Sequence, residues 1–431
     1  MILAPTLLLN AGSGAAIARP TFSRDFAGEK TLNNGTGPAI TFTRASNATY
    51  FDANGTLQTA ANDTPRFDHD PATGASRGLL IEEARTNSIR NSQAGGAVAG
   101  SAGTGPSNWN VSGNANGLTR TISLGSANGL SYVDVRFVGT ATATVQNFFD
   151  PEGLTAITAS SSQVWTHSAY VALIAGTVPD LQIGVREGLA DGTFVTSGNL
   201  NAAPSLTASL QRFSHTRTLT DATTARVTPT IRVSISNGVA YDFTLRIAAP
   251  QLEQGAFATS YIPTTSAAAT RAADFARVTP ISSFYNQGEG TLFGEFSKFQ
   301  MTANSKVAMF FDPINTARYG GLENDGGTPT TNRFIYQNNA GSTVASISFA
   351  SAAANTVYRN CGGYASDNFQ AAQNGTLGTA DTSGTPADTL SHFGVGCLAS
   401  TNGQFFLNGH IRRIAYYPRR LSNTLLQQLT T

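Results

Sequence analysis

RVTPTIRVSI, residues 226–235, and YDFTLRI, residues 241–247, both alternate apolar and polar side chains. In the first run Val227, Ile231 and Val233 share one face, and Arg232 lies on the other. Because successive side chains of a strand point to opposite faces, each run requires one buried face and one solvated face. The two runs therefore predict half-buried strands of an antiparallel β-sandwich, with outward arginines that include Arg246 of the second run.

The same alternation recurs in YVDVRFV, residues 132–138, and in LQIGV, residues 181–185. Helical periodicity is nearly absent, and its clearest case is LSNTLLQQL, residues 421–429, which Ser422 is placed to cap. No repeat of fixed period is present, so neither a propeller nor a solenoid is indicated. We therefore expect an all-β protein with little helix.

Composition restricts the classes of function. The 431 residues carry a formal net charge of +1, and only 12% of them are charged, so no global field recruits nucleic acid or an anionic membrane. No apolar run approaches the ~18–20 residues that a membrane helix requires, and no membrane insertion is expected. The N-terminal MILAPTLLLNAG lacks a basic region, so we expect no signal peptide and synthesis in a reducing cytoplasm.

Two cysteines, Cys361 and Cys397, are present. In a chain made in a reducing compartment they are expected to be buried free thiols. A disulfide between neighbouring strands is the alternative.

Two segments of low complexity mark boundaries between three predicted domains, which comprise residues 1–84, 85–265 and 266–431. Residues 94–108, AGGAVAGSAGTGPSN, indicate a loop just inside the second domain, and residues 264–274, TTSAAATRAAD, indicate a linker to the third. In the first domain, residues 41–71 are rich in turn signals and make a poor independent core. This segment is therefore expected to pack against a neighbouring domain or a symmetry mate.

The third domain carries a strong hairpin signal. Asn408-Gly409 lies between the apolar runs FFL and HIRRIAYY, and both central positions of a type I′ turn require a positive φ. With about 160 residues and many strands, this domain suits a second two-sheet sandwich.

No catalytic constellation stands out. Hydrolysis of a glycoside needs two carboxylates about 5–10 Å apart, whereas the adjacent Glu82 and Glu83 would point to opposite faces of a strand. A pair formed across strands by Asp312, Glu323 and Asp325 stays open. There is no nucleophile elbow, phosphate loop or dinucleotide fingerprint. We therefore expect a protein that is not an enzyme, with a polysaccharide depolymerase as the alternative.

Carbohydrate binding is the class that remains, because flat aromatic rings and polar side chains recognise sugars. The candidate platforms are Trp109 and three tyrosines, Tyr319, Tyr336 and Tyr364. A place in the core is the alternative for Trp109.

The outward arginines of the second domain are a further candidate surface for an acidic polysaccharide, through bidentate contacts to carboxylates. This set comprises Arg136, Arg186, Arg226, Arg232 and Arg246. Pairing across strands with Asp134, Glu187 and Asp242 is the alternative.

A structural calcium ion is the only cofactor that the sequence suggests. GLENDGGT, residues 321–328, offers Glu323, Asn324 and Asp325 as hard oxygen ligands. An ordinary turn explains the same residues equally simply.

Stretches in all three predicted domains resemble known proteins. ITFTRASNATYFDANGTLQTAANDTPRFDHDP with RGLLIEEARTNSIRNS resembles a segment of tailed-bacteriophage head-spike, head-fibre and tail-fibre proteins and of related gene-transfer-agent particles. RNSQAGGAVAGSAGTGPSNWNVSG, QVWTHSAYVAL and YDFTLRIAAPQLEQGAFATSYIPTT resemble jelly-roll carbohydrate-binding modules of such spikes. TRAADFARV, YNQGEGTLFGEF and FFLNGHIRRIAYYPRRLSNTLLQQL are similar to the laminin-G or concanavalin-like sandwich that often ends them.

The resemblance implies an N-terminal attachment segment followed by a jelly-roll and a laminin-G-like sandwich. It implies a spike or fibre on the virion surface that binds host polysaccharide and contacts other virion proteins through its N-terminal segment. It also implies a homo-oligomer, with a trimer as the family's form. A depolymerase tailspike and a purely structural decoration protein are the alternatives.

Overall fold

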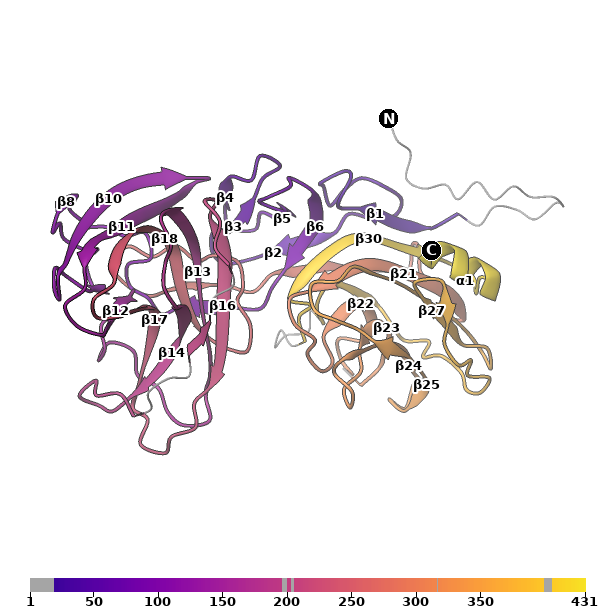
Figure 1. Cartoon of the computed structure of the whole chain (residues 1–431). Coiled ribbons are helices and arrows are strands. Elements are labelled where there is room, and N and C mark those ends of the chain that lie inside the picture. Colours follow the sequence, from indigo (N-terminus) through magenta and orange to yellow (C-terminus); the bar gives the residue numbers. More distant parts are fainter. Residues whose placement is uncertain (1–18, 196–199, 203–204, 316, 399–404) are drawn as a thin grey trace. The chain divides into compact units, whose positions relative to one another are not determined.

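The computed structural model describes residues 19–195, 200–202, 205–315, 317–398 and 405–431, with backbone alone for 200–202. These residues form thirty strands and one helix, so the expected all-β fold is confirmed. They divide into two compact units (Figure 1). Unit 1 takes its described residues from Met1–Gly55, Thr59–Ala84 and Ala272–Thr431, and unit 2 from Thr56–Gln58 and Arg85–Arg271.

Unit 1 contains two large antiparallel sheets. Sheet 1a has the order β28-β27-β26-β21-β30-β6-β5, with β1 also paired to β30. Its strands are β1 (Phe22–Asp25), β5 (Arg66–His69), β6 (Ser76–Ile81), β21 (Glu289–Lys298), β26 (Tyr358–Ala365), β27 (Gln370–Gln373), β28 (Thr376–Leu377) and β30 (Gly409–Tyr417).

Sheet 1b has the order β2-β20-β29-β22-β23-β24-β25. Its strands are β2 (Thr41–Thr43), β20 (Phe275–Val278), β22 (Lys306–Phe311), β23 (Tyr319–Asn324), β24 (Thr331–Gln337), β25 (Thr343–Ser351) and β29 (His392–Val395). A separate two-stranded ribbon joins β3 (Ala48–Phe51) and β4 (Leu57–Ala60).

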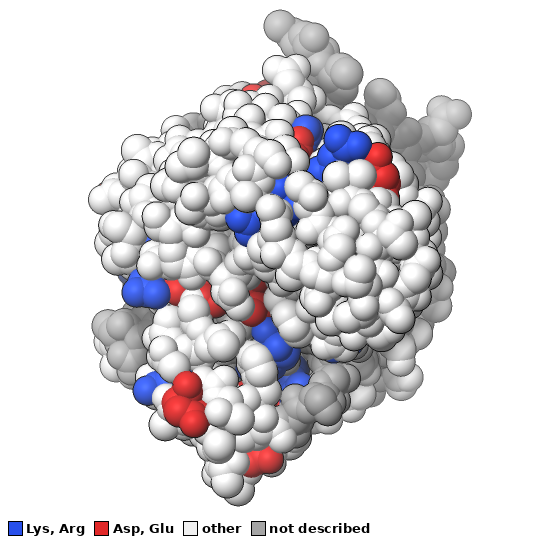
Figure 2. Space-filling model, turned by 60° about the vertical axis from the view of Figure 1, so that its left-hand side comes forward, with Lys and Arg blue, Asp and Glu red and all other residues white. Residues whose placement is uncertain are grey.

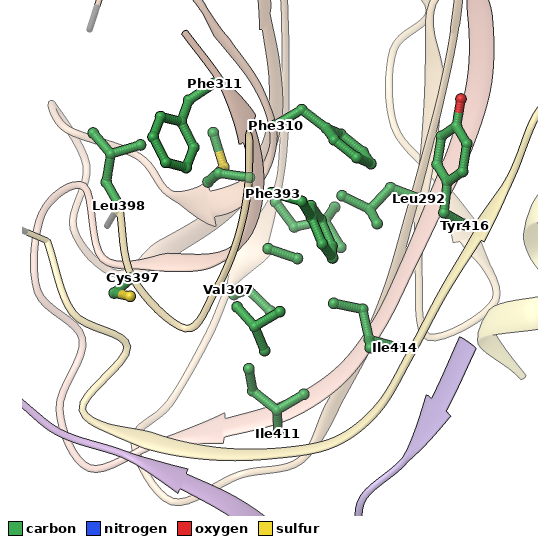
Figure 3. Close-up of a cluster of buried hydrophobic side chains, with 14 of the residues drawn as sticks. Leu292, Val307, Phe310, Phe311, Phe393, Cys397, Leu398, Ile411, Ile414 and Tyr416 are labelled. Atoms are coloured by element: carbon green, nitrogen blue, oxygen red, sulfur yellow. The ribbon is translucent and has the colours of Figure 1, made fainter. Parts of the chain in front are cut away.

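The core of unit 1 is built from aromatic and branched side chains of both sheets (Figure 3). Phe310 of β22 stacks on Phe393 of β29, with ring centroids 4.5 Å apart, and Tyr416 of β30 meets Phe310 edge-on at 5.1 Å. Ile411 and Ile414 of β30 belong to the same buried cluster. Burial of these faces is what the alternation in the sequence demands.

The N-terminal residues belong to this same unit, which corrects the expected separate domain of residues 1–84. β1 pairs with the C-terminal half of β30, and β6 pairs with its start, where Gly409 lies opposite Ile81 (Figure 1). Leu79 and Ile81 are fully buried in the core of unit 1. Their burial requires partners more than three hundred residues away, which no local pattern reveals. Residues 41–71 thus gain their packing within the chain.

The expected hairpin at Asn408-Gly409 is wrong. Asn408 does adopt a positive φ of 50°, but Gly409 is the first residue of β30 and pairs with both Ile81 and Lys298. A Cβ at Gly409 would lie 2.1 Å from the carbonyl oxygen of Ser297. The glycine is therefore required by the close approach of a neighbouring strand, not by a turn.

Unit 2 is a second two-sheet sandwich. Sheet 2a has the order β16-β13-β18-β11-β10-β8, and sheet 2b has the order β15-β14-β17-β12-β9. Sheet 2a comprises β8 (Gly100–Ser101), β10 (Leu118–Ala127), β11 (Leu130–Thr140), β13 (Val164–Ala175), β16 (Gln211–Thr218) and β18 (Ala240–Gln254). Sheet 2b comprises β9 (Asn110–Val111), β12 (Val145–Asp150), β14 (Leu181–Gly188), β15 (Leu200–Ala202) and β17 (Arg226–Ile235).

The apolar positions of the alternating runs form the core of unit 2, as predicted. Val135 of β11 lies opposite Leu245 of β18, and both are buried. Ile231 and Val233 of β17 line the same core from the other sheet. The chain enters and leaves unit 2 through a short ribbon of β7 (Arg85–Asn87) and β19 (Ala269–Arg271).

The helix α1 (Asn423–Thr430) lies where the sequence predicts it. The Ser422 hydroxyl accepts a hydrogen bond from the Leu425 amide at 3.4 Å, which caps the first turn. Leu426 is buried in a small cluster with Leu421 and Cys361. Among the described helical residues there is no segment long and apolar enough to cross a membrane.

Candidate functional site

The outward arginines of unit 2 lie on two different faces. In β11 and β18 the buried residues alternate with Arg136 and Arg246, which places these two on the outer face of sheet 2a. In β14 and β17 burial does not alternate in this way, but Arg186 and Arg232 lie on the face opposite to Val185 and Ile231, which is the outer face of sheet 2b, and Arg186 is itself buried. The single arginine-lined surface considered from the sequence is therefore divided between two sheets.

The outer face of sheet 2b carries polar side chains in rows that cross β14, β17 and β12, because residues opposite each other in antiparallel strands share a face. We call this surface the 2b face. One row joins Gln182, Arg232 and Phe148, and a neighbouring row joins Gln146 and Ser234. A third row contains Thr230. A fourth row joins Thr228 and Arg186. The 2b face therefore combines amide, hydroxyl and guanidinium groups with an aromatic ring.

A buried ion pair lies beneath one end of the 2b face. Arg186 donates through Nη2 to both carboxylate oxygens of Asp150, at 3.0 and 2.9 Å, and through Nε to the Thr230 hydroxyl at 2.8 Å. The guanidinium lies between the rings of Phe148 and Phe194, 4.3 and 3.6 Å from their centroids. This contact fixes the orientation of both the cation and the rings.

Asp150 is fully buried although it ends a strand on the outer face. It also accepts hydrogen bonds from the Thr230 hydroxyl at 2.7 Å and from the Asn110 amide at 3.2 Å. Burial raises the pKa of this carboxyl even though Arg186 and its hydrogen-bond donors oppose the shift. Loss of either partner of this buried pair would leave an uncompensated charge, so the two side chains hold each other in place beneath the face.

The accessible part of the 2b face lies beside that pair. Arg232 contacts the Gln182 amide oxygen through Nη2, and Gln182, Arg232 and Phe148 are all half-buried. Ser234 donates to Asp180 at 2.7 Å, and both keep solvent access. Because Arg232 is held by a neutral amide, its charge is available to an incoming acidic group.

On the outer face of sheet 2a, the arginines are paired as the alternative interpretation expects. Arg246 forms a two-pronged ion pair with Asp134, at 2.8 and 2.9 Å, and stacks on Tyr132. Arg136 pairs with Asp242 in the same way, at 2.8 and 2.7 Å. On the surface shown in Figure 2, charged side chains are sparse, and blue and red atoms often lie next to each other. Arg246 is thus already committed to a carboxylate.

Trp109 lies partly in the core of unit 2. Its indole Nε1 donates to the Asn91 carbonyl oxygen at 2.8 Å, and its ring packs against the apolar cluster between the two sheets. The side chain is half-buried. This geometry agrees with the core alternative for Trp109.

The three candidate tyrosines have different environments. Tyr336 and Tyr364 are buried in the core of unit 1, with ring centroids 4.4 Å apart and hydroxyl contacts to Tyr285 and Tyr416. A sugar cannot reach such rings, so their selection as platforms is corrected. Tyr319 is half-buried and faces the Lys306 ammonium, 4.5 Å from the ring centroid.

The candidate calcium ligands face lysine and arginine nitrogens instead. Glu323 contacts Lys306 and accepts from Arg333 Nε at 2.8 Å, Asp325 accepts from Arg333 at 3.1 Å, and Asn324 accepts from Lys298. These nitrogen donors occupy the oxygens that a divalent cation would need. Among the described residues there is no cluster of three or more acidic, histidine or cysteine side chains suited to a metal.

The sequence alone did not single out Asp150, Gln182 or Phe148. Alternation placed Arg186 and Arg232 on one side of their strands, which was the available signal for the 2b face. Asp150 follows two phenylalanines at a strand end, and its role depends on the register between β12 and β17.

Comparison with known proteins finds only distant structural similarity. No family model and no curated protein matches the chain. A carbohydrate-binding module, CBM40, of the Ruminococcus gnavus IT-sialidase, bound to α2,3-sialyllactose, is 14% identical, with coverage of 34% of this chain and 83% of its own and a TM-score of 0.30. The CBM22-1–CBM22-2 tandem domain of Paenibacillus barcinonensis Xyn10C is 10% identical, with coverage of 75% and 98% and a TM-score of 0.24.

Enzymes are also among the matched structures, which corrects the expectation that the chain is not an enzyme. Trypanosoma rangeli sialidase in complex with sialic acid is 10% identical, covers 90% of this chain and 76% of its own, and has a TM-score of 0.28. The exclusion of an enzymatic activity is therefore withdrawn. At this level of similarity no activity is transferred from the sialidase to this chain.

Proposed function

We propose that this protein binds polysaccharide of a host cell surface through the 2b face of unit 2. The observation that carries the proposal is the row of Gln182, Arg232 and Phe148, half-buried and next to the buried pair of Arg186 and Asp150. Sugar hydroxyls bond to amide and guanidinium groups, while the apolar face of a sugar ring packs on an aromatic ring. The matched carbohydrate-binding modules accord with this choice.

The row favours an acidic polysaccharide. Arg232 contacts a neutral amide, whereas Arg136 and Arg246 of the other face are each held by an aspartate. A carboxylate on the ligand would therefore gain a bidentate partner at Arg232 without displacing an existing ion pair. The preformed position of Arg186 between two rings keeps the neighbouring surface rigid.

We further propose that the chain acts on the surface of a virion or a gene-transfer-agent particle, as a spike or fibre. The support is the resemblance of residues 40–71, 77–92 and the end of unit 2 to such proteins. A shallow face of this kind supplies weak binding on its own, and several copies in a homo-oligomer, such as a trimer, supply avidity. Because β1, β5 and β6 are part of unit 1, attachment to other virion proteins is proposed for that unit as a whole.

The test is binding of the full chain to a panel of acidic and neutral surface polysaccharides on a glycan array, with capsule pull-down as a second assay. The double variant Gln182→Ala/Arg232→Ala should lose about tenfold or more in affinity, which corresponds to about 1.4 kcal/mol. Arg136→Ala is the matched control, since it removes an exposed strand arginine of the same unit from the other face, and its binding should equal that of the wild type.

Unchanged binding by the double variant, or equal losses in both variants, contradicts the role of the 2b face. Adsorption of particles that lack the protein tests the role on the virion, because a purely structural decoration leaves adsorption unchanged. Release of new reducing ends from the bound polysaccharide would instead identify a depolymerase.

A further inference from the structure

Unit 1 contains a lysine with an unusual position. Lys298 is the last residue of β21 in sheet 1a, and Asn324 is the last residue of β23 in sheet 1b. Both side chains point between the sheets, and both are almost completely buried, with exposed fractions of 2% and 0%. The Lys298 amine is therefore placed at the point where the two sheets of the sandwich face each other.

The partners of this amine are amide oxygens. Lys298 Nζ contacts Asn324 Oδ1 and lies 3.3 Å from Asn332 Oδ1. Asn324 is itself held in place, because its Nδ2 donates to the Pro329 carbonyl oxygen at 2.9 Å. Asn332 is fixed by donation from its Nδ2 to the Gln373 oxygen at 2.9 Å. The nucleophile and a carbonyl group are thus held together in a site closed to water.

The nearby carboxylates are already neutralised by other cations. Glu323 contacts Lys306 and Arg333, and Asp325 contacts Arg333. A protonated Lys298 would add a third cation to two carboxylates in a buried site, where an uncompensated charge is costly. Burial lowers the pKa of Lys298 well below its usual value. The neutral amine, which is the nucleophilic form, is favoured by both effects.

We propose that Lys298 and Asn324 form an isopeptide bond within the folded chain. Nζ attacks Cγ of Asn324, which is one covalent bond away from the oxygen that Nζ contacts. A proton passes from Nζ to Nδ2, the Cγ–Nδ2 bond breaks, and ammonia leaves. An amine and a primary amide thus give a secondary amide and ammonia, with no oxidant, metal or cofactor.

The fold supplies what this otherwise slow reaction needs. A fixed contact between two groups replaces a bimolecular encounter and is equivalent to an effective concentration of up to roughly 10⁵–10⁸ M in well-oriented cases. Asn332 acts as a positioning residue, because its oxygen accepts an Nζ proton and turns the lone pair of the amine towards Asn324. The product would join sheet 1a to sheet 1b covalently and restrict the unfolded chain, as other cross-links do.

The decisive experiment is the intact mass of the purified, denatured full chain, compared with that of Lys298→Met. Beyond the difference due to the substitution, the wild type should be lighter by one ammonia molecule. In a tryptic digest Lys298 should resist cleavage, and its peptide should be linked to the peptide of residues 319–333. Fragmentation should place the link at Asn324. Asn332→Ala, the matched control, should still form the bond, but more slowly.

Amine labelling of the denatured protein gives an independent reading that does not depend on any variant. Lys30 and Lys306 should react, and Lys298 should not, so the two other lysines of the chain serve as internal controls. A full mass, normal labelling of Lys298, or a link to Asn332 in place of Asn324 overturns the proposal.

Discussion

Asp274 accepts a hydrogen bond from Arg44 Nη1 at 3.1 Å, although 230 residues separate the two in the sequence. Both side chains are completely buried. Asp274 also pairs with Arg66 and accepts the Glu82 amide at 2.9 Å. One carboxylate near the start of the last segment of unit 1 therefore holds three parts of the N-terminal segment in place.

Replacing Asp274 with Asn should destabilise unit 1 by about 3–5 kcal/mol, because buried Arg44 and Arg66 would each lose the charge of a carboxylate partner, although Arg66 would keep its pair with Glu82. The loss of unfolding free energy is measured by denaturant unfolding of the full chain, monitored by far-UV circular dichroism. The control is Arg77→Gln, which removes an exposed pair with Asp70 in the same unit and should cost at most about 1 kcal/mol. Equal effects of the two substitutions would show that the buried network does not anchor the segment.

Trp109 should contribute to stability more than to binding. Trp109→Ala removes a ring that packs on the core of unit 2 and the donor to Asn91, and it should cost about 2 kcal/mol of unfolding free energy. Trp109→Phe should recover most of the packing. The polysaccharide affinity of both folded variants should stay within about twofold of the wild type. A loss of binding by the stable Phe variant would instead show that Trp109 is part of the binding site.

His167 should make unit 2 less stable in mild acid. Its ring is buried between the sheets, and Nδ1 lies 3.0 Å from the Gly184 carbonyl oxygen. Burial lowers its pKa to about 4 from 6.5. The unfolded state therefore binds the proton first, so stability is complete above pH 6.5 and falls as the pH drops towards 4, by about 3 kcal/mol in total.

Urea unfolding of the wild type and of His167→Gln at a series of pH values tests this. Other groups titrate in the same range, including His215, whose pKa is also lowered by burial. The difference between the two proteins isolates His167, and it should shrink as the pH falls from 6.5 to 4. A constant difference across this range would contradict the buried neutral histidine.

The two cysteines should be inert in the native protein. Both are free and buried, as expected from the sequence, and burial raises the pKa of Cys397 to about 12 and that of Cys361 further above its usual range. Because the thiolate is the reactive form, a thiol reagent should label neither residue until unfolding. Rapid labelling of either thiol under native conditions would show that its part of unit 1 opens locally.

Local sequence pattern predicted the strands of unit 2 well, because each alternating run has one buried face. The alternation of apolar and polar residues was sufficient to predict that Val135 and Leu245 are buried. The same rule failed for Tyr336, because β24 is buried on both faces and alternation then cannot separate buried from exposed side chains. Tyr364 follows two glycines in β26, where no apolar neighbour marks a face.

Long-range pairing was the part that no local pattern contained. The position of residues 22–81 in unit 1 depends on contacts of β1 and β6 with β30. The 2b face depends on the register that brings Gln182, Arg232 and Phe148 into one row. Arginines were visible as outward residues, but only the register separates those with an aspartate partner from Arg232.

The connectivity of the chain has a consequence for how such proteins change. The polypeptide leaves unit 1 after Ala84 and returns at Ala272, and β7 and β19 hold those two crossing points side by side. Apart from Thr56–Gln58, unit 2 is therefore an insert whose ends meet, and domain insertions at such points are commonly tolerated. An exchange of residues 85–271 for another domain of equal end spacing would therefore replace the whole 2b face while sheets 1a and 1b keep their own strands.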